Sequence, residues 1–156
     1  MMEIEIPGRE KPLRLRSLVL DYNGTIALDG RILPEAAEGI RALSGFLDIY
    51  VLTADTHGTA AQACEDLPVT LRTFPREGAG AFKADIVREL GEGVCAVGNG
   101  FNDIQMMDAA EFRIAVLDRE GVCAALISHA DILVRSGGDA LGLLRHPARL
   151  TATMRS

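Results

Sequence analysis

Short apolar runs alternate along this chain with stretches whose apolar residues recur at helical spacing. The runs are mostly continuous, which is typical of strands that are covered on both faces. This alternation predicts an α/β fold, a Rossmann-like three-layer sandwich whose mostly parallel sheet carries helices on both faces. Strands are expected at residues 17–20, 49–52, 69–73, 94–97, 113–117 and 132–134, and helices at 34–47, 57–67, 82–90, 102–110, 122–129 and 139–144.

Two small hairpins are expected beside this sheet. Residues 3–6 and 13–16 alternate polar and apolar side chains around Pro7-Gly8-Arg9, which predicts a β-hairpin in the N-terminal segment. A second hairpin is predicted within residues 25–33, because Asp29-Gly30 lies between apolar residues and is a strong turn signal.

The length of 156 residues suits one domain that covers residues 1–156, and neither a linker nor an internal repeat divides it. The chain has no run of 18 apolar residues, and its first residues lack the apolar segment of a signal peptide. We therefore expect a cytoplasmic protein without a membrane span.

The net charge of -6 argues against nucleic acid as a partner. The densest basic stretch, Lys11, Arg14 and Arg16, alternates with leucines like the solvent face of a strand. No Cys or His spacing is typical of a metal site. Buried free thiols are expected at the three cysteines, which lie far apart: Cys64, Cys95 and Cys123.

Polar residues follow the first, second and fourth expected strands of the sheet. These segments are Asp21-Tyr22-Asn23-Gly24-Thr25, Thr53-Ala54-Asp55 and Gly98-Asn99-Gly100-Phe101-Asn102-Asp103, and Lys83 opens the helix before the fourth strand. Because the carboxyl ends of parallel strands meet at one edge of a sheet, we expect these residues to lie together. A carboxylate nucleophile, oxygen ligands for a metal and a cation are the parts of a phosphoryl-transfer site.

The same segments resemble the motifs of the haloacid dehalogenase (HAD) superfamily. Residues 21–25 are similar to its first motif, Asp-x-Asp-Gly-Thr, and residues 98–103 to its Gly-Asp-Gly-x-Asn-Asp motif, while Thr53 and Lys83 match the hydroxyl and the lysine between them. The sequence particularly resembles the phosphorylation domain of P-type ATPases, over roughly residues 18–144. It looks like a soluble, stand-alone relative of those pumps.

The resemblance implies a phosphohydrolase in which Asp21 attacks phosphorus and becomes an aspartyl phosphate. Thr53 and Lys83 would hold the phosphoryl oxygens, with Ala54 and Gly24 beside them, and Lys83 would also offset the charge of Asp21. The substrate would be a phosphorylated small molecule or macromolecule.

The resemblance also implies Mg²⁺ as the cofactor, since this ion prefers oxygen ligands. Its ligands would be Asp21, the main-chain carbonyl of Asn23, Asn99 and Asp103. Supporting roles would fall to Asn102, Thr25 and Asp55.

Two residues depart from the motifs of the superfamily. Asn23 stands where the phosphatases have an aspartate that acts as general acid and base, so hydrolysis is expected to be slow. Asn99 stands in place of an aspartate that binds the metal, so Mg²⁺ is expected to bind less tightly. A regulatory module that binds phosphate or a phosphoprotein is the alternative function. A response-regulator receiver domain fits poorly, because Asp21 ends the first long strand and Gly-Thr follows two residues later.

The intervals between Asp21, Thr53 and Lys83 are filled by expected strands and helices, so no cap domain is expected. The 25–33 hairpin or a neighbouring subunit of a homo-oligomer could cover such an open site. Asp55 could cap the following helix or act in the site. His57 is expected to be an ordinary helix residue, with a substitute acid as the less favoured interpretation.

Overall fold

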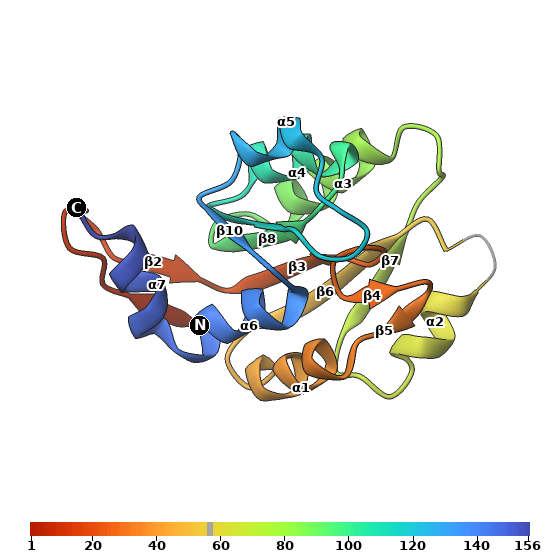
Figure 1. Cartoon of the computed structure of the whole chain (residues 1–156), viewed down its shortest axis with the longest axis horizontal. Coiled ribbons are helices and arrows are strands. Elements are labelled where there is room, and N and C mark those ends of the chain that lie inside the picture. Colours follow the sequence, from red (N-terminus) through yellow and green to blue (C-terminus); the bar gives the residue numbers. More distant parts are fainter. Residues whose placement is uncertain (56–57) are drawn as a thin grey trace.

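A parallel sheet forms the centre of the computed structural model, which describes residues 1–55 and 58–156. In this part of the chain the sheet has six strands in the order β10-β9-β8-β3-β6-β7 (Figure 1). Every neighbouring pair in it is parallel, which confirms the predicted sheet. The strands are β3 (Ser17–Asp21), β6 (Asp48–Thr53), β7 (Thr70–Thr73), β8 (Val94–Gly98), β9 (Phe112–Val116) and β10 (Ile132–Val134).

Helices cover both faces of this sheet and complete the three layers (Figure 1). One face carries α1 (Pro34–Leu43) and α6 (Gly137–Arg145), and the other carries α3 (Ala79–Leu90) and α4 (Ile104–Ala109). None of the helices in the described ranges is long and apolar enough to cross a membrane. The remaining helices are α2 (Thr59–Cys64), the 3-10 helix η1 (Phe101–Asp103), α5 (Ala124–Ile127) and α7 (Pro147–Met154).

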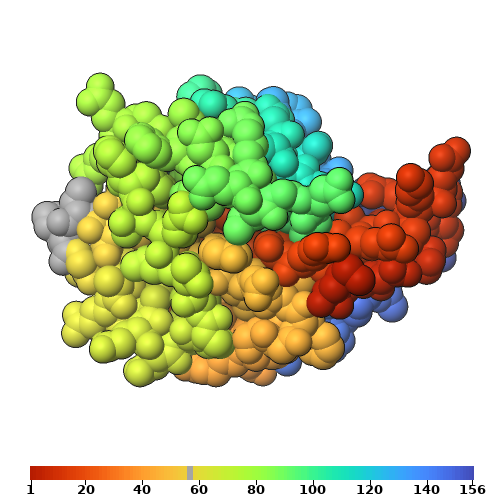
Figure 2. Space-filling view, turned by 180° about the vertical axis from the view of Figure 1, so that it is seen from behind, coloured from red at the N-terminus to blue at the C-terminus, as the bar shows by residue number. Residues whose placement is uncertain are grey.

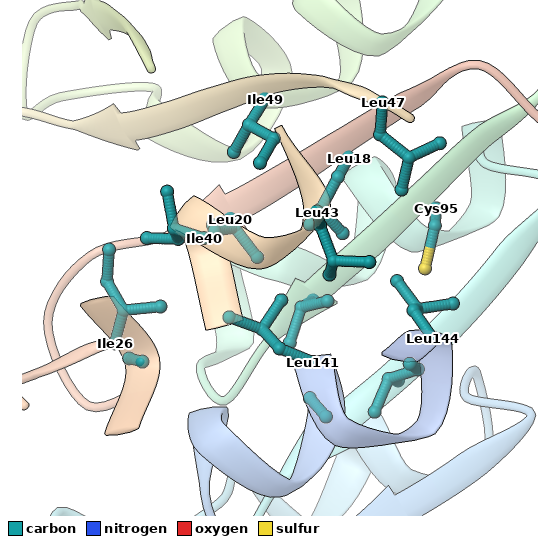
Figure 3. Close-up of a cluster of buried hydrophobic side chains, with 14 of the residues drawn as sticks. Leu18, Leu20, Ile26, Ile40, Leu43, Leu47, Ile49, Cys95, Leu141 and Leu144 are labelled. Carbon is teal, nitrogen blue, oxygen red and sulfur yellow. The ribbon is translucent and has the colours of Figure 1, made fainter. Parts of the chain in front are cut away.

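The central strand β3 is buried on both faces, as its continuous apolar sequence predicts. Leu18 and Leu20 pack into the apolar cluster between the sheet and helices α1 and α6, whereas Val19 belongs to the cluster on the opposite face (Figure 3). Burial of each such side chain contributes about 1.5–3 kcal/mol. Asp21 ends this strand, so the two cores hold its position from both sides.

Both predicted hairpins are present and are shorter than expected. Strands β1 (Met2–Ile4) and β2 (Leu13–Leu15) pair antiparallel outside the main sheet. Strands β4 (Ala27–Leu28) and β5 (Arg31–Ile32) flank the Asp29-Gly30 turn, where both residues have positive φ. The hydroxyl of Tyr22 donates a hydrogen bond to the carbonyl oxygen of Gly30 (2.7 Å) and fixes this second hairpin to the body of the protein.

Helix α7 was not predicted from the sequence, although Pro147 at its first position is a helix-start signal. Its Leu150 is fully buried, and the hydroxyl of Thr151 donates a hydrogen bond to the carbonyl oxygen of Glu5 (3.1 Å). The helix is short, and its partner is the N-terminal segment, far away in sequence. In the space-filling view this N-terminal segment protrudes at one end of the molecule, with C-terminal residues beneath it (Figure 2).

Three local expectations need correction. Helix α3 begins at Ala79, so Lys83 lies one turn inside the helix rather than opening it. Phe82 is 43% exposed and does not belong to the buried face of α3. Cys64 and Cys95 are buried free thiols as predicted, but Cys123 is only half-buried. Ile86 is buried in α3 as expected, but Lys83 and not Phe82 lies on the buried face of this helix.

Helix α6 starts in direct contact with the segment that follows Asp21. A Cβ atom at Gly137, the first residue of α6, would overlap the carbonyl oxygen of Thr25. A backbone oxygen cannot move aside as a flexible side chain can. Glycine at this position therefore lets the helix support the loop that carries Thr25.

We predict that Gly137→Ala lowers the free energy of unfolding by about 1–3 kcal/mol, the usual cost of overpacking. Gly142→Ala in the same helix is the matched control, because the nearest atom to its added Cβ is 4.0 Å away. This control is expected to be neutral or to stabilise by up to about 1 kcal/mol through helix propensity. Urea denaturation of the three proteins measures both changes. Equal stability of Gly137→Ala and the wild type would contradict the close packing of α6 on Thr25.

Candidate active site

The carboxyl ends of β3, β6 and β8 surround a pocket of about 450 Å³. Each of the three motif segments contributes residues to its wall, and so does Lys83. Its lining is formed by Asp21, Tyr22, Asn23, Thr53, Ala54, Asp55, Thr59, Ala60, Phe74, Arg76, Ala79, Lys83, Asn99, Gly100 and Asn102. The predicted meeting of these polar segments is therefore confirmed.

Lys83 joins two of the motif segments, residues 21–25 and 98–103, through its ammonium group. Its Nζ lies 2.7 Å from Oδ1 of Asp21, 2.8 Å from Oδ1 of Asp103 and 3.0 Å from Oδ1 of Asn102. The three acceptors match the three protons of the ammonium group. Lys83 is only 2% exposed, so these charge-assisted bonds lie almost entirely out of water.

The surroundings of this ion cluster shift the pKa values of two of its members. Burial raises the pKa of Asp21 to about 6, and the negative charge of Asp103 adds to the increase, while Lys83 and Thr25 oppose it. Burial alone would lower the pKa of Lys83, but the carboxylates of Asp21 and Asp103 outweigh it and raise this pKa. The lysine therefore stays charged at neutral pH, and Asp21 would lose its proton more readily with a further cation beside it.

Asp103 is fully buried and both of its oxygens are engaged. Oδ1 accepts from Lys83, and Oδ2 accepts from the backbone N–H groups of Asn99 (3.1 Å) and Gly100 (3.0 Å). A Cβ at position 98 would overlap Oδ2, which explains the glycine there. Through these contacts Asp103 holds Lys83 and the 98–103 turn.

Thr25 lies between Asp21 and Asn99. Its hydroxyl oxygen is 3.0 Å from Oδ2 of Asp21 and 3.2 Å from Oδ1 of Asn99. The single hydroxyl proton serves one of these oxygens at a time. Nδ2 of Asn99 donates to the carbonyl oxygen of Gly121 (3.1 Å), so the amide cannot flip without placing two acceptors together. The oxygen of Asn99 therefore faces the Thr25 hydroxyl, which also contacts Asp21.

The oxygen atoms at this edge fit the preference of Mg²⁺. Oδ2 of Asp21 and Oδ1 of Asn99 lie on either side of the Thr25 hydroxyl, and Asn23 lines the pocket with an exposed side chain. Carboxylate, amide and carbonyl oxygens are hard ligands that suit this ion. Within the described residues no group of three or more His, Cys, Asp or Glu side chains could hold a metal, which agrees with the two asparagines of this site.

The segment after β6 forms one wall of the pocket. The hydroxyl oxygen of Thr53 accepts a hydrogen bond from the N–H of Asp55 (3.3 Å), which leaves the hydroxyl proton for another acceptor. The carboxylate of Asp55 accepts from the N–H groups of Ala60 (2.9 Å) and Ala61 (3.1 Å) and so caps α2. Asp55 thus combines the capping role with a place in the wall, whereas His57 lies outside the described residues.

Gly24 does not line the pocket, contrary to its predicted place beside the phosphate. Its N–H donates to the carbonyl oxygen of Ala27 (2.8 Å), and φ is +80°. A Cβ here would overlap Nδ2 of Asn99. Glycine is required at this position for the close approach of Asn99, and not for contact with a ligand.

Part of the pocket wall has no motif in the sequence and was not predicted. Phe74 and Arg76 line the pocket from the loop between β7 and α3. The ring of Phe74 stacks on that of Phe82, with centroids 6.3 Å apart. Conversely, no residue of the 25–33 hairpin is among the lining residues, so this hairpin does not cover the pocket.

Solved structures of other proteins share this fold. The 3-deoxy-D-manno-octulosonate 8-phosphate phosphatase of Moraxella catarrhalis, solved with magnesium ion, phosphate ion and KDO, is 14% identical and has a TM-score of 0.66 over 90% of this chain and 87% of that chain. A zinc-transporting PIB-type ATPase is 26% identical, with a TM-score of 0.62. That match covers 78% of this chain but 20% of the ATPase.

Sequence comparison identifies the family. An uncharacterized protein of Methanocaldococcus jannaschii is 40% identical over 62 residues, which are 40% of this chain and 67% of that protein. The model of the haloacid dehalogenase-like hydrolase family matches residues 4–111, most of the chain. The chain therefore belongs to the haloacid dehalogenase-like hydrolases.

Proposed function

We propose that this protein is a magnesium-dependent phosphohydrolase that acts through an aspartyl phosphate on Asp21. The observation that carries the proposal is the buried pair of Asp21 and Lys83 at the pocket, with Nζ 2.7 Å from Oδ1. The lysine holds one carboxylate oxygen, and the other oxygen accepts from the hydroxyl of Thr25. The arrangement orients a carboxylate for attack on a phosphate ester.

In the first step a carboxylate oxygen of Asp21 forms a bond to phosphorus, and the bond from phosphorus to the leaving oxygen breaks. In the second step water attacks the phosphorus, and the Asp21 carboxylate and inorganic phosphate are released. The Thr53 hydroxyl, whose oxygen already accepts from Asp55, donates its proton to a phosphoryl oxygen. The ammonium of Lys83 offsets negative charge on Asp21 during both steps.

The residues that would hold Mg²⁺ are Asp21 through Oδ2, Asn23 through its main-chain carbonyl and Asn99 through Oδ1. When bound, the ion would offset the charge of the phosphoryl oxygens. The role of Asp103 in this proposal is to hold Lys83, because both carboxylate oxygens of Asp103 are already engaged.

A module that binds a phosphorylated ligand with little turnover is the second candidate. Asn23 favours it, because an amide can neither donate a proton to a leaving group nor accept one from water at neutral pH. Asn99 favours it too, since this site has less negative charge for Mg²⁺ than a site with two carboxylates at these positions. The pocket is open to either a small phosphate ester or a phosphorylated macromolecule.

Asp21→Asn should abolish phosphatase activity, because an amide is not a nucleophile at phosphorus. The assay is the hydrolysis of p-nitrophenyl phosphate with Mg²⁺ and with excess chelator. Lys83 keeps its contact with Asp103, so the variant should remain folded, which circular dichroism can establish. Turnover at the wild-type rate in the folded variant would disprove the assignment of the nucleophile.

Asn23→Asp should raise steady-state turnover, by up to about 10²–10⁴-fold if a general base for water is what the site lacks. The phosphoenzyme should accumulate in the wild type and disappear in the variant, which intact mass after rapid acid quench reports. Asn23→Gln is the control, since it restores no carboxylate. A fast wild-type enzyme with no gain in Asn23→Asp would assign the acid–base role to another residue.

Asn99→Asp should tighten Mg²⁺ binding, by about tenfold if the added charge contributes about 1.4 kcal/mol. The physical reason is the attraction of a carboxylate for the cation at the position now occupied by an amide oxygen. Isothermal titration calorimetry at fixed ionic strength measures both dissociation constants. Equal or weaker binding in Asn99→Asp, together with wild-type affinity in Asn99→Ala, would mean that Asn99 is not a ligand.

A further inference from the structure

Asn99 uses all four of its polar groups in hydrogen bonds. Its backbone N–H donates to Oδ2 of Asp103 (3.1 Å), and its carbonyl oxygen accepts from the N–H of Cys123 (2.8 Å). In its side chain, Oδ1 accepts from Thr25 (3.2 Å) and Nδ2 donates to the carbonyl oxygen of Gly121 (3.1 Å). Asn99 thus contacts both Thr25, which is hydrogen-bonded to Asp21, and a segment outside the three motifs.

That segment, residues 117–123, connects β9 to α5. It turns at Gly121, whose φ is +80° and whose N–H donates to the carbonyl oxygen of Asp118 (2.8 Å). The N–H of Cys123 and the carbonyl of Gly121 both bind Asn99. Two backbone groups of this loop are therefore hydrogen-bonded to Asn99, the residue that follows β8.

An amide is the side chain that this arrangement requires. A carboxylate at position 99 has no proton to donate, and one of its oxygens would face the Gly121 carbonyl at about the distance of the present bond. The amide also fits against Gly24, where any side chain would overlap Nδ2. The geometry thus supplies a reason for the asparagine that loss of metal charge alone does not.

We propose that Asn99 is a positioning residue that ties the 117–123 loop to the metal-binding edge of the pocket, and that cation binding at its Oδ1 tightens the loop. The second half of this inference rests on the proposed function. A cation on the amide oxygen withdraws electrons from the nitrogen, so that Nδ2–H becomes a stronger donor to Gly121. Linkage requires the reverse effect as well, so this tie, the hydrogen bond from Nδ2 of Asn99 to Gly121, strengthens binding of the cation when it is intact.

Hydrogen exchange tests the tie in the metal-free protein. The N–H groups of Gly121 and Cys123 are both hydrogen-bonded, so their exchange rates report on the loop. We expect Asn99→Asp and Asn99→Ala to speed exchange about two- to tenfold, the range for loss of one neutral hydrogen bond. Asn99→Ala removes the amide without adding charge, which separates the tie from repulsion and serves if Asn99→Asp does not fold.

Asn102→Asp is the matched control for charge. It adds a carboxylate beside Lys83, whereas no side-chain contact of Asn102 with the loop is seen in the described structure. Its exchange in the loop should stay at the wild-type rate. The labelling rate of the Cys123 thiol is a second readout, because Cys123 is half-buried whereas Cys64 and Cys95 are buried.

Magnesium titration separates the two parts of the inference. In the wild type, saturating Mg²⁺ should slow exchange at Gly121 and Cys123, and in Asn99→Ala this slowing should be lost. Unchanged metal-free exchange and thiol labelling in both Asn99 variants would overturn the tie. A wild-type loop that does not respond to Mg²⁺, although calorimetry shows binding, would overturn the coupling alone. If calorimetry shows no Mg²⁺ binding at all, the proposed metal dependence and the coupling fail together, while the metal-free rates still decide the tie.

Discussion

The buried ammonium group of Lys83 connects the central strand of the sheet to the helices on one of its faces. It sits between the carboxylates of Asp21 and Asp103, at 2.7 and 2.8 Å, and is almost completely shielded from water. Removing the ammonium of Lys83 would leave these two carboxylates buried without a cation, a loss of the kind that typically costs about 3–5 kcal/mol. The three charges come from β3, α3 and η1, so the cluster forms only when the sheet and the helices on this face have come together. Stability and chemistry therefore depend on the same contacts.

Much of the fold could be predicted, because hydrophobic periodicity and turn chemistry are local signals. The parallel strands, the Asp29-Gly30 turn and the helix that starts at Pro34 all follow from such signals. Helix α7 was missed because its stability depends on contacts with the N-terminal segment, which the local sequence does not encode. The boundary of α3 was misplaced because its inner face carries Lys83, a charged residue that periodicity treats as exposed.

The candidate site was predictable where the polar residues follow strands, since topology alone brings strand ends together. The hydrogen-bond partners of each polar residue within the site were not predictable. Asp103 and Asp55 are both carboxylates beside a pocket, yet the oxygens of each are used by backbone N–H groups, and Asp103 also binds Lys83. Only the three-dimensional hydrogen-bond pattern distinguishes these residues from Asp21. Phe74 and Arg76 line the pocket because of the course of the loop between β7 and α3, which no sequence motif predicts.

The contact between the C-terminal residue and the N-terminal segment has a consequence for how such a unit can be built into larger proteins. The N–H of Ser156 donates to the carbonyl oxygen of Pro7 (3.2 Å), and this corner lies away from the carboxyl end of β3 (Figure 1). The N-terminus also lies away from the carboxyl end of β3 (Figure 1), so a connection to another chain at either end need not cross the pocket. The similar segment of the zinc-transporting ATPase makes up only 20% of that protein. Fusion through this corner would leave the mouth of the pocket open to whatever the host chain presents to it.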